Sequence, residues 1–185
     1  MSRGFTHENA VSGSVEWLTP KSVFDALGCE FDLDPCSPGQ GLTHVPARRA
    51  LTEADDGLAH HWRGTVWLNP PYGRGISTWL QRAEEHAISG AGSVIALVPA
   101  RTDTAWFQHF AARADGLLLH AGRISFHRGD KDAPPTGSPG TGSVFLAFGA
   151  WAAWKLHDSN LPGLYVGRPG TPLRPGSPLE RKDTP

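Results

Sequence analysis

Apolar positions along the chain follow two different periods. In three segments the apolar residues lie three and four positions apart, which is the spacing of one helix face. These segments span residues 20–27, 76–89 and 102–114. Thr19 is an expected N-cap for the first segment, and Pro20 is a favourable first helical residue. The helical period therefore predicts three helices.

Shorter segments are rich in β-branched and aromatic residues, with Gly, Pro or Asp at their ends, which predicts strands. The predicted strands span 30–35, 65–68, 93–98, 116–120, 123–128 and 143–148. Strands and helices alternate in the first part of the chain and strands follow one another at the end. This order predicts an α/β fold whose mostly parallel sheet ends in a C-terminal antiparallel hairpin.

Composition divides the 185 residues into three parts. Residues 1–16 are polar and are expected to be a flexible N-terminal lead, and 17–158 form a single domain. Residues 159–185 are rich in Pro and Gly and are expected to be a C-terminal tail that is mobile or docks loosely. The chain has no apolar run of the roughly 20 residues that cross a bilayer and no secretory signal, so we expect a soluble intracellular protein.

Net charge and cysteine content exclude few kinds of partner or binding site. A net charge of −1 neither indicates nor excludes nucleic acid as a partner, because a basic face can lie on a neutral chain. Two cysteines are too few for a disulfide scaffold or a four-ligand metal site, so buried free thiols are expected. His60 and His61 lack further ligands at metal-binding spacing, so no metal is expected.

Polar residues follow three of the predicted strands. Asp34-Pro35-Cys36 ends the first strand, NPPY (69–72) ends the second, and Pro99-Ala100-Arg101 ends the third. The carboxyl ends of parallel strands meet at one edge, which is where ligands bind in open α/β sheets. The sequence therefore predicts that these three loops share one site.

The NPPY loop is suited to accept hydrogen bonds from an amino group. Proline removes backbone donors, so the loop offers carbonyl oxygens and the side-chain oxygen of Asn69. Acceptors at Asn69 and at the Pro70 carbonyl would stabilise positive charge on a planar amine during attack on an electrophile. Pro71 stiffens the loop, and the ring of Tyr72 can stack on a base.

Each of these features also has a structural interpretation. NPPY can be a plain turn, and Asp34 can be a strand-end turn or a helix cap. The acidic run around Asp55 and Asp56 can be a solvated loop. Phe126 can be a core residue, and the arginines can be ordinary surface charge.

The ordered set of motifs resembles the phage-type Dam DNA N6-adenine methyltransferases. The resembling segments are WLTP (17–20), DLDPC (32–36), DDGL (55–58) with Trp62, NPPY (69–72), LVPARTDT (97–104) with WF (106–107), and GRISF (122–126). The resemblance implies a Rossmann-like class I methyltransferase fold, with helices on both faces of the sheet. Many adenine methyltransferases have F-x-G-x-G at the first strand, where this chain has FDLDPCS.

The resemblance also implies roles for individual residues, with S-adenosylmethionine as the cofactor. Catalysis is implied for the NPPY residues Asn69, Pro70, Pro71 and Tyr72. The implied cofactor-binding residues are Thr19, Pro20, Asp34, Pro35, Cys36, Asp55, Asp56 and Asn69. The implied substrate-binding residues are Tyr72, Arg74, Arg101, Arg123 and Phe126, with Arg128 and Lys131 as further candidate phosphate contacts.

The implied activity is methyl transfer to the N6 amine of adenine in double-stranded DNA, with the target base flipped out of the helix. The same loop would suit a cytosine N4 amine or a protein glutamine amide, and a non-catalytic module that binds DNA or protein is a further alternative. The resemblance also implies a phage or prophage protein in the cytoplasm of a bacterial host, with protection from restriction as a role. The sequence leaves the recognition site and the oligomeric state open.

Overall fold

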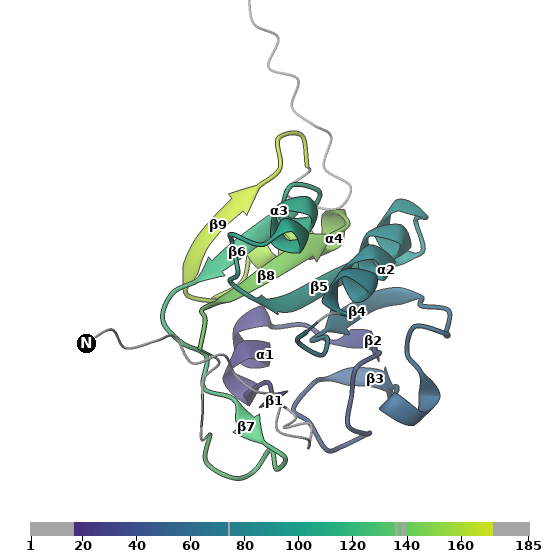
Figure 1. The fold of residues 1–185 in the computed structure, drawn as a ribbon, viewed down its shortest axis with the longest axis vertical. Helices are drawn as coiled ribbons and strands as arrows, with labels where there is room; N and C mark the ends of the chain where they lie inside the picture. Colours follow the sequence, from purple (N-terminus) through teal and green to yellow (C-terminus); the bar gives the residue numbers. More distant parts are fainter. Residues whose placement is uncertain (1–16, 74, 136, 138–139, 172–185) are drawn as a thin grey trace, which may run out of the picture.

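A central β-sheet organises the protein (Figure 1). The computed structural model describes residues 17–171 apart from 74, 136, 138 and 139. Within these residues the sheet has seven strands in the order β3-β2-β4-β5-β8-β6-β9. In chain order they are β2 (Phe31–Asp34), β3 (Ala47–Ala50), β4 (Gly64–Leu68), β5 (Gly92–Pro99), β6 (Gly116–His120), β8 (Ser143–Phe148) and β9 (Gly163–Gly167).

The sheet is mixed, and the expectation of a mostly parallel sheet is not confirmed. The strand pairs β2·β3, β2·β4 and β4·β5 are parallel. The pairs β5·β8, β6·β8 and β6·β9 are antiparallel. Strand β8 returns between β5 and β6, so β6 runs in the same direction as β5. Antiparallel strands lie near the C-terminus, but they do not form the predicted hairpin, because a long connection over residues 121–142 joins β6 to β8.

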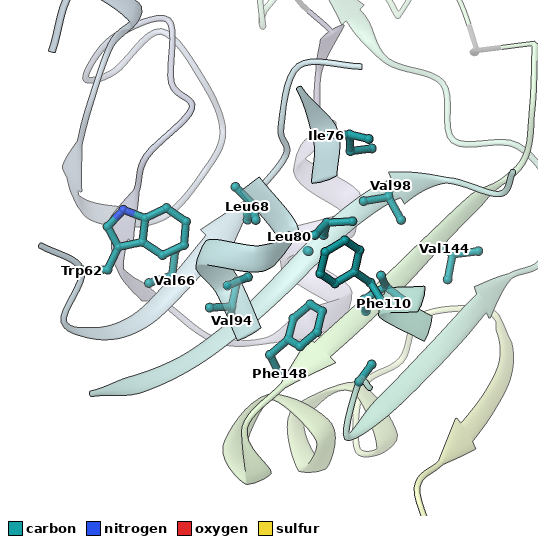
Figure 2. Close-up of a cluster of buried hydrophobic side chains, with 14 of the residues drawn as sticks. Trp62, Val66, Leu68, Ile76, Leu80, Val94, Val98, Phe110, Val144 and Phe148 are labelled. Carbon is teal, nitrogen blue, oxygen red and sulfur yellow. The ribbon is translucent and has the colours of Figure 1, made fainter. Parts of the chain in front are cut away.

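Helices cover both faces of the sheet, as predicted. They are α1 (Lys21–Leu27), α2 (Ile76–Ile88), α3 (Ala105–Ala111) and α4 (Ala150–His157), with a short 3-10 helix, η1 (Glu53–Asp55). The apolar faces of α2 and α3 pack on one side of the sheet, and those of α1 and α4 pack on the other. Figure 2 shows the first of these two cores, where Leu80 of α2 and Phe110 of α3 lie over strands β4, β5 and β8.

Strand β5 contributes to both cores, which explains its continuous apolar sequence. Val94 and Val98 point into the core under α2 and α3, whereas Ile95 and Leu97 point into the core under α1 and α4. Alternate residues of a strand face opposite sides of the sheet, so a strand covered by helices on both sides needs apolar residues throughout. The α/β class predicted from the sequence is therefore correct.

Helix boundaries differ from the sequence-based expectation at two N-termini. The N-cap of α1 is Pro20, without a side-chain capping bond, so Thr19 does not cap the helix. Helix α3 begins at Ala105 with Thr104 as N-cap, whereas the predicted helical segment began at residue 102. The Thr104 hydroxyl instead donates to the Arg101 carbonyl, which keeps residues 101–104 in a turn.

The segment predicted as a strand over 123–128 is mostly a loop. Ile124 and Phe126 are buried in the core under α1 and α4, which accounts for their apolar character without strand pairing. Only His127–Arg128 form a strand, β7, and it pairs antiparallel with β1 (Trp17–Leu18) outside the main sheet. This prediction was wrong because buried loop residues and strand residues have the same apolar signal.

Elements β1, β3, α4 and β9 were not predicted. Strand β9 lies inside the expected tail, where it pairs with β6 as the edge strand of the sheet, so this part of the tail prediction is wrong. The two N- and C-terminal segments, 1–16 and 172–185, lie outside the described residues. In the described part of the chain, no helix has both the length and the apolar character needed to cross a bilayer.

Candidate active site

The carboxyl ends of β2, β4 and β5 lie at one edge of the sheet because these strands are parallel. From β2 the chain moves outward to β3, and it then returns to β4 on the other side of β2. Such a reversal of strand order opens a crevice where ligands bind in α/β proteins. Asp34 ends β2 and Asn69 directly follows β4, so both predicted site loops flank this switch point.

Asn69 is held in one orientation by its donor end. Its Nδ2 donates to the main-chain carbonyl of Trp17 at 3.1 Å. Its Oδ1 is buried and has no hydrogen-bond partner. Since the donor end is occupied, the acceptor end is the part of the amide that remains for a ligand. The following Pro70 is buried and Pro71 is exposed.

Tyr72 has a hydroxyl that is also buried without a partner. Burial raises the pKa of this phenol, so it stays protonated across the physiological range. An unpaired buried hydroxyl costs free energy that a hydrogen bond would recover. The hydroxyl group therefore provides a second polar position for a ligand in the NPPY loop.

Thr19 provides a third such atom. The residue is 2% exposed, and its Oγ1 has no hydrogen-bond partner. Because Thr19 does not cap α1, its hydroxyl serves no local purpose in the structure. A buried polar group without a protein partner is rare and is typical of a position that binds a water, an ion or a ligand.

Buried side-chain atoms without a partner concentrate on the expected site residues. In the described part of the chain they are Thr19 Oγ1, Asn69 Oδ1, Tyr72 OH, Arg82 Nε and His120 Nδ1. His120 ends β6, whose carboxyl end lies at the same edge as that of β5. Burial lowers the pKa of this histidine. His120 is not among the site residues predicted from the sequence, although its place as the last residue of a predicted strand was a usable signal.

The Asp34 side chain stabilises the loop in which it lies. Its carboxylate accepts from the backbone N–H of Cys36 at 3.1 Å. Asp34 is only 3% exposed, and burial raises the pKa of its carboxyl to about 7. This geometry matches the strand-end turn that the sequence left open. Beside Asp34 a small depression is lined by Gly39, Gln40, Gly41, Thr43, Val45, Ala47 and Ala50.

Asp55 and Asp56 stabilise local turns. Asp55 Oδ2 accepts from the backbone and hydroxyl of Thr52 at 2.8 and 2.7 Å, which forms a capping box for η1. Asp56 has a left-handed φ of 51° and accepts from the Leu58 backbone at 3.2 Å. These contacts match the solvated acidic loop that the sequence left open as an alternative.

Of the predicted substrate-binding residues, Arg101 and Arg123 are exposed. Arg123 donates to the Gly140 carbonyl at 3.2 Å, which ties the loop after β6 to the segment before β8. Phe126 has no exposed surface and packs in the core, its ring 6.0 Å from that of Trp17. The structure therefore gives Phe126 a packing role. Arg74 lies outside the described residues.

Cysteine and histidine side chains show no metal-binding arrangement in the described residues. His60 instead contacts the carbonyl of Asp55 and the guanidinium of Arg49. Cys29 and Cys36 are free thiols and are half-buried. Burial raises the pKa of Cys29 to about 11.

Comparison with known protein families decides the class of this chain. Residues 9–161 match the family model described as DNA N-6-adenine-methyltransferase (Dam). The chain belongs to the Dam family. The matched region contains the NPPY loop and every other candidate site residue, so the family resemblance seen in the sequence is confirmed. Membership in the Dam family implies a methyltransferase that acts on adenine in DNA, with S-adenosylmethionine as methyl donor. No curated protein and no solved structure matches the chain.

Proposed function

We propose that this protein transfers the methyl group of S-adenosylmethionine to the N6 amine of adenine in DNA, within a Rossmann-like domain whose NPPY loop receives the flipped base. The observation that carries the proposal is the hydrogen bonding and burial of the Asn69 side-chain amide. Its amide nitrogen is bound to Trp17, and its Oδ1 is buried, unpartnered and next to the switch point of the sheet. An acceptor in this state is matched to an amine hydrogen.

Thr19 fits the cofactor, since its Oγ1 is buried and lacks a protein partner. Thr19 Oγ1 can hydrogen-bond to the polar methionine part of the cofactor, and the loop at Asp34–Cys36 would form the neighbouring wall. When bound, S-adenosylmethionine supplies an activated methyl group on a sulfonium centre. The residues of this chain supply orientation and hydrogen bonding.

Asn69 and the Pro70 carbonyl act on the amine of adenine. The nitrogen lone pair of this amine is delocalised into the ring, which makes it a poor nucleophile. Two acceptors on its hydrogens favour pyramidal geometry and stabilise the positive charge that grows on the nitrogen. Each hydrogen bond to the charged group is worth about 1.5–3 kcal/mol, so the two bonds together can supply about two to four powers of ten in rate. The extra proton then leaves the nitrogen to water.

DNA reaches this site as a double strand with its target adenine extruded. A paired amine lies inside the base stack, so the base must be flipped at a cost of a few kcal/mol. The ring of Tyr72 holds the extruded base by stacking. Arg101 and Arg123 are exposed and follow β5 and β6 at the same edge, so we expect them to contact phosphates.

Incubation of the purified protein with plasmid DNA and labelled S-adenosylmethionine tests the proposal. Nucleoside mass spectrometry is expected to detect N6-methyladenine, and sequencing that detects modified bases would give its context. Label on N4-methylcytosine, or on glutamine of added protein with none on DNA, would overturn the assignment of adenine. Calorimetric titration is expected to show cofactor binding, and its absence at millimolar S-adenosylmethionine would favour a non-catalytic module.

A further inference from the structure

The strand pair β1·β7 links the NPPY loop to the segment that follows β6. Trp17 pairs with Arg128 and Leu18 pairs with His127. Trp17 also provides the carbonyl that accepts from Asn69 at 3.1 Å. The position of β7 is thus connected to the orientation of the Asn69 amide through one residue, Trp17.

Side chains hold Trp17 in place on β7. The guanidinium carbon of Arg128 lies 4.5 Å from the centre of the Trp17 ring, and the Phe126 ring approaches the Trp17 ring edge-on at 6.0 Å. Gly137 leaves room for this ring, since a Cβ there would lie 3.1 Å from Trp17 Cζ3. Isolated two-stranded ladders are at best marginally stable, so these side-chain contacts are needed to fix the two residues of β1.

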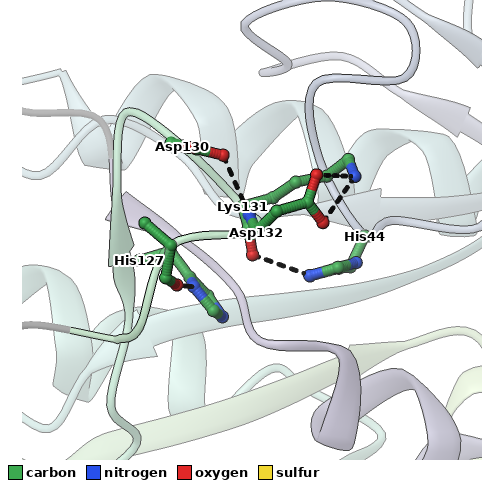
Figure 3. Close-up of polar contacts among 6 residues, drawn as sticks. His44, His127, Asp130, Lys131 and Asp132 are labelled. Carbon is green, nitrogen blue, oxygen red and sulfur yellow. Dashed lines mark hydrogen bonds and ion pairs between the residues drawn. The ribbon is translucent and has the colours of Figure 1, made fainter.

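The loop that carries β7 is itself anchored to the domain. His127 Nδ1 lies 2.6 Å from the Ala133 carbonyl, and His44 Nε2 lies 3.0 Å from the Lys131 carbonyl (Figure 3). The second contact joins this loop to the loop between β2 and β3. Arg128 therefore projects from a supported segment onto Trp17.

An asparagine amide has a donor end and an acceptor end of nearly equal size, so a half-turn of the group exchanges them. With Trp17 in place, the Nδ2 end is bound and Oδ1 is left as the acceptor. If Trp17 moved, the amide could present its N–H groups to the substrate amine, donor against donor. The carbonyl of Trp17 thus decides which atom of Asn69 meets the substrate.

We propose that Arg128 is a positioning residue for methyl transfer, a role that rests on the proposed function. By stacking on Trp17 it holds the carbonyl that keeps Asn69 Oδ1 turned toward the amine. Arg128 need not touch the base or the cofactor in order to act in this way. The effect of removing it should therefore fall on the chemical step.

Steady-state kinetics separate this role from phosphate binding. Arg128→Ala is expected to lower kcat about two- to fivefold at saturating DNA and cofactor, the factor set by an exposed cation–π contact. Arg128→Lys should recover part of the loss, because an ammonium stacks less well than a guanidinium. The control Arg168→Ala, an exposed arginine after β9 at the opposite edge of the sheet, should match the wild type. The proposal would be overturned if kcat were unchanged and the KM for DNA were raised. Together with a slope of log binding constant against log salt concentration that falls by about one, this result would mean that Arg128 contacts a phosphate.

Nuclear magnetic resonance of the ligand-free protein gives a second readout. The side-chain amide signals of Asn69, identified by their loss in Asn69→Ala, are expected to show slow exchange and a hydrogen-bonded shift. Arg128→Ala should move them toward the values of an exposed asparagine, and signals that stay in place would overturn the proposal. This experiment needs neither DNA nor cofactor. If the wild-type protein had no methyltransferase activity, the proposed function would be wrong. The amide signals would still test the link between Arg128 and Asn69.

Discussion

Asn69 donates its side-chain amide to the main-chain carbonyl of Trp17, a residue 52 positions earlier in the chain. This contact turns an amide that could face either way into a directed acceptor. Its counterpart, Oδ1, is buried and unpartnered. Leaving an acceptor in this state costs about 1–3 kcal/mol of folding free energy. A bound amine would recover that free energy, most of all as positive charge develops on it.

Replacing Asn69 tests this acceptor directly. Asn69→Ala is expected to lower kcat by about 10²–10³, the usual effect of removing one preorganised charge-stabilising group. The dissociation constant for S-adenosylmethionine should change by less than about threefold by calorimetry, because the group acts mainly in the transition state. Asn160→Ala, an exposed asparagine after α4, serves as control. Equal losses in turnover and cofactor affinity would place Asn69 in a structural role.

The contributions of the Tyr72 ring and of its hydroxyl can be measured separately with two variants. The hydroxyl has no partner in the ligand-free protein, so Tyr72→Phe should leave the free energy of unfolding unchanged or raise it by about 1 kcal/mol. Tyr72→Ala removes the ring and should raise the KM for DNA about tenfold, since stacking on a base is worth about 1–3 kcal/mol. Urea denaturation and steady-state kinetics measure the two effects. If Phe weakens DNA binding as much as Ala does, then the hydroxyl and not the ring is what binds.

Asp34 should make stability depend on pH. Burial raises the pKa of its carboxyl from 3.8 to about 7 in the folded protein. Between these two values the folded state keeps a proton that the unfolded state has lost, so the free energy of unfolding falls as pH rises. Asp34→Asn removes this contribution while its side-chain oxygen can still accept from Cys36.

Urea denaturation at pH 5 and pH 8 checks the prediction for Asp34. The Asn variant is expected to gain stability relative to the wild type at pH 8 compared with pH 5, by a few kcal/mol at most. Parallel pH profiles for the two proteins would show that the carboxyl titrates normally in the folded state.

Gly57 marks a close approach between the loop after β3 and the loop after β2. A Cβ at this position would lie 2.1 Å from the Pro35 carbonyl oxygen. Gly57→Ala should therefore displace one loop and lower the free energy of unfolding by about 2 kcal/mol. Gly75→Ala is a matched control, because nothing lies within 4 Å of its Cβ and its φ is −84°. Thermal denaturation of both variants measures the difference, and equal melting temperatures would contradict the close approach.

Helices and strands whose positions depend on local geometry were predicted correctly from the sequence. The helical period gave α1 and α2 to within about one residue, and the apolar runs gave β2, β4, β5, β6 and β8. Placing NPPY at the end of a strand also needed no tertiary information, because two prolines must stop a strand after Leu68. The site loops at Asp34 and Asn69 followed from those strand ends.

Other features depend on contacts between distant residues. Strands β3 and β9 are edge strands with mixed composition, so only pairing with β2 and β6 defines them. Phe126 has the apolar character of a strand residue, yet it is a buried loop residue. The roles of Asp34 and Asp55 in turns depend on hydrogen-bond partners that a pattern of residue types does not specify.

The amino-acid sequence by itself determined the periodic elements, the α/β class, the NPPY loop and the family, because these depend on residue order over short stretches. The tertiary structure alone decided that β8 runs against its neighbours, that Thr19 leaves its helix uncapped, and that Trp17 fixes the Asn69 amide. Each of these depends on long-range packing, which brings together groups that no local pattern connects.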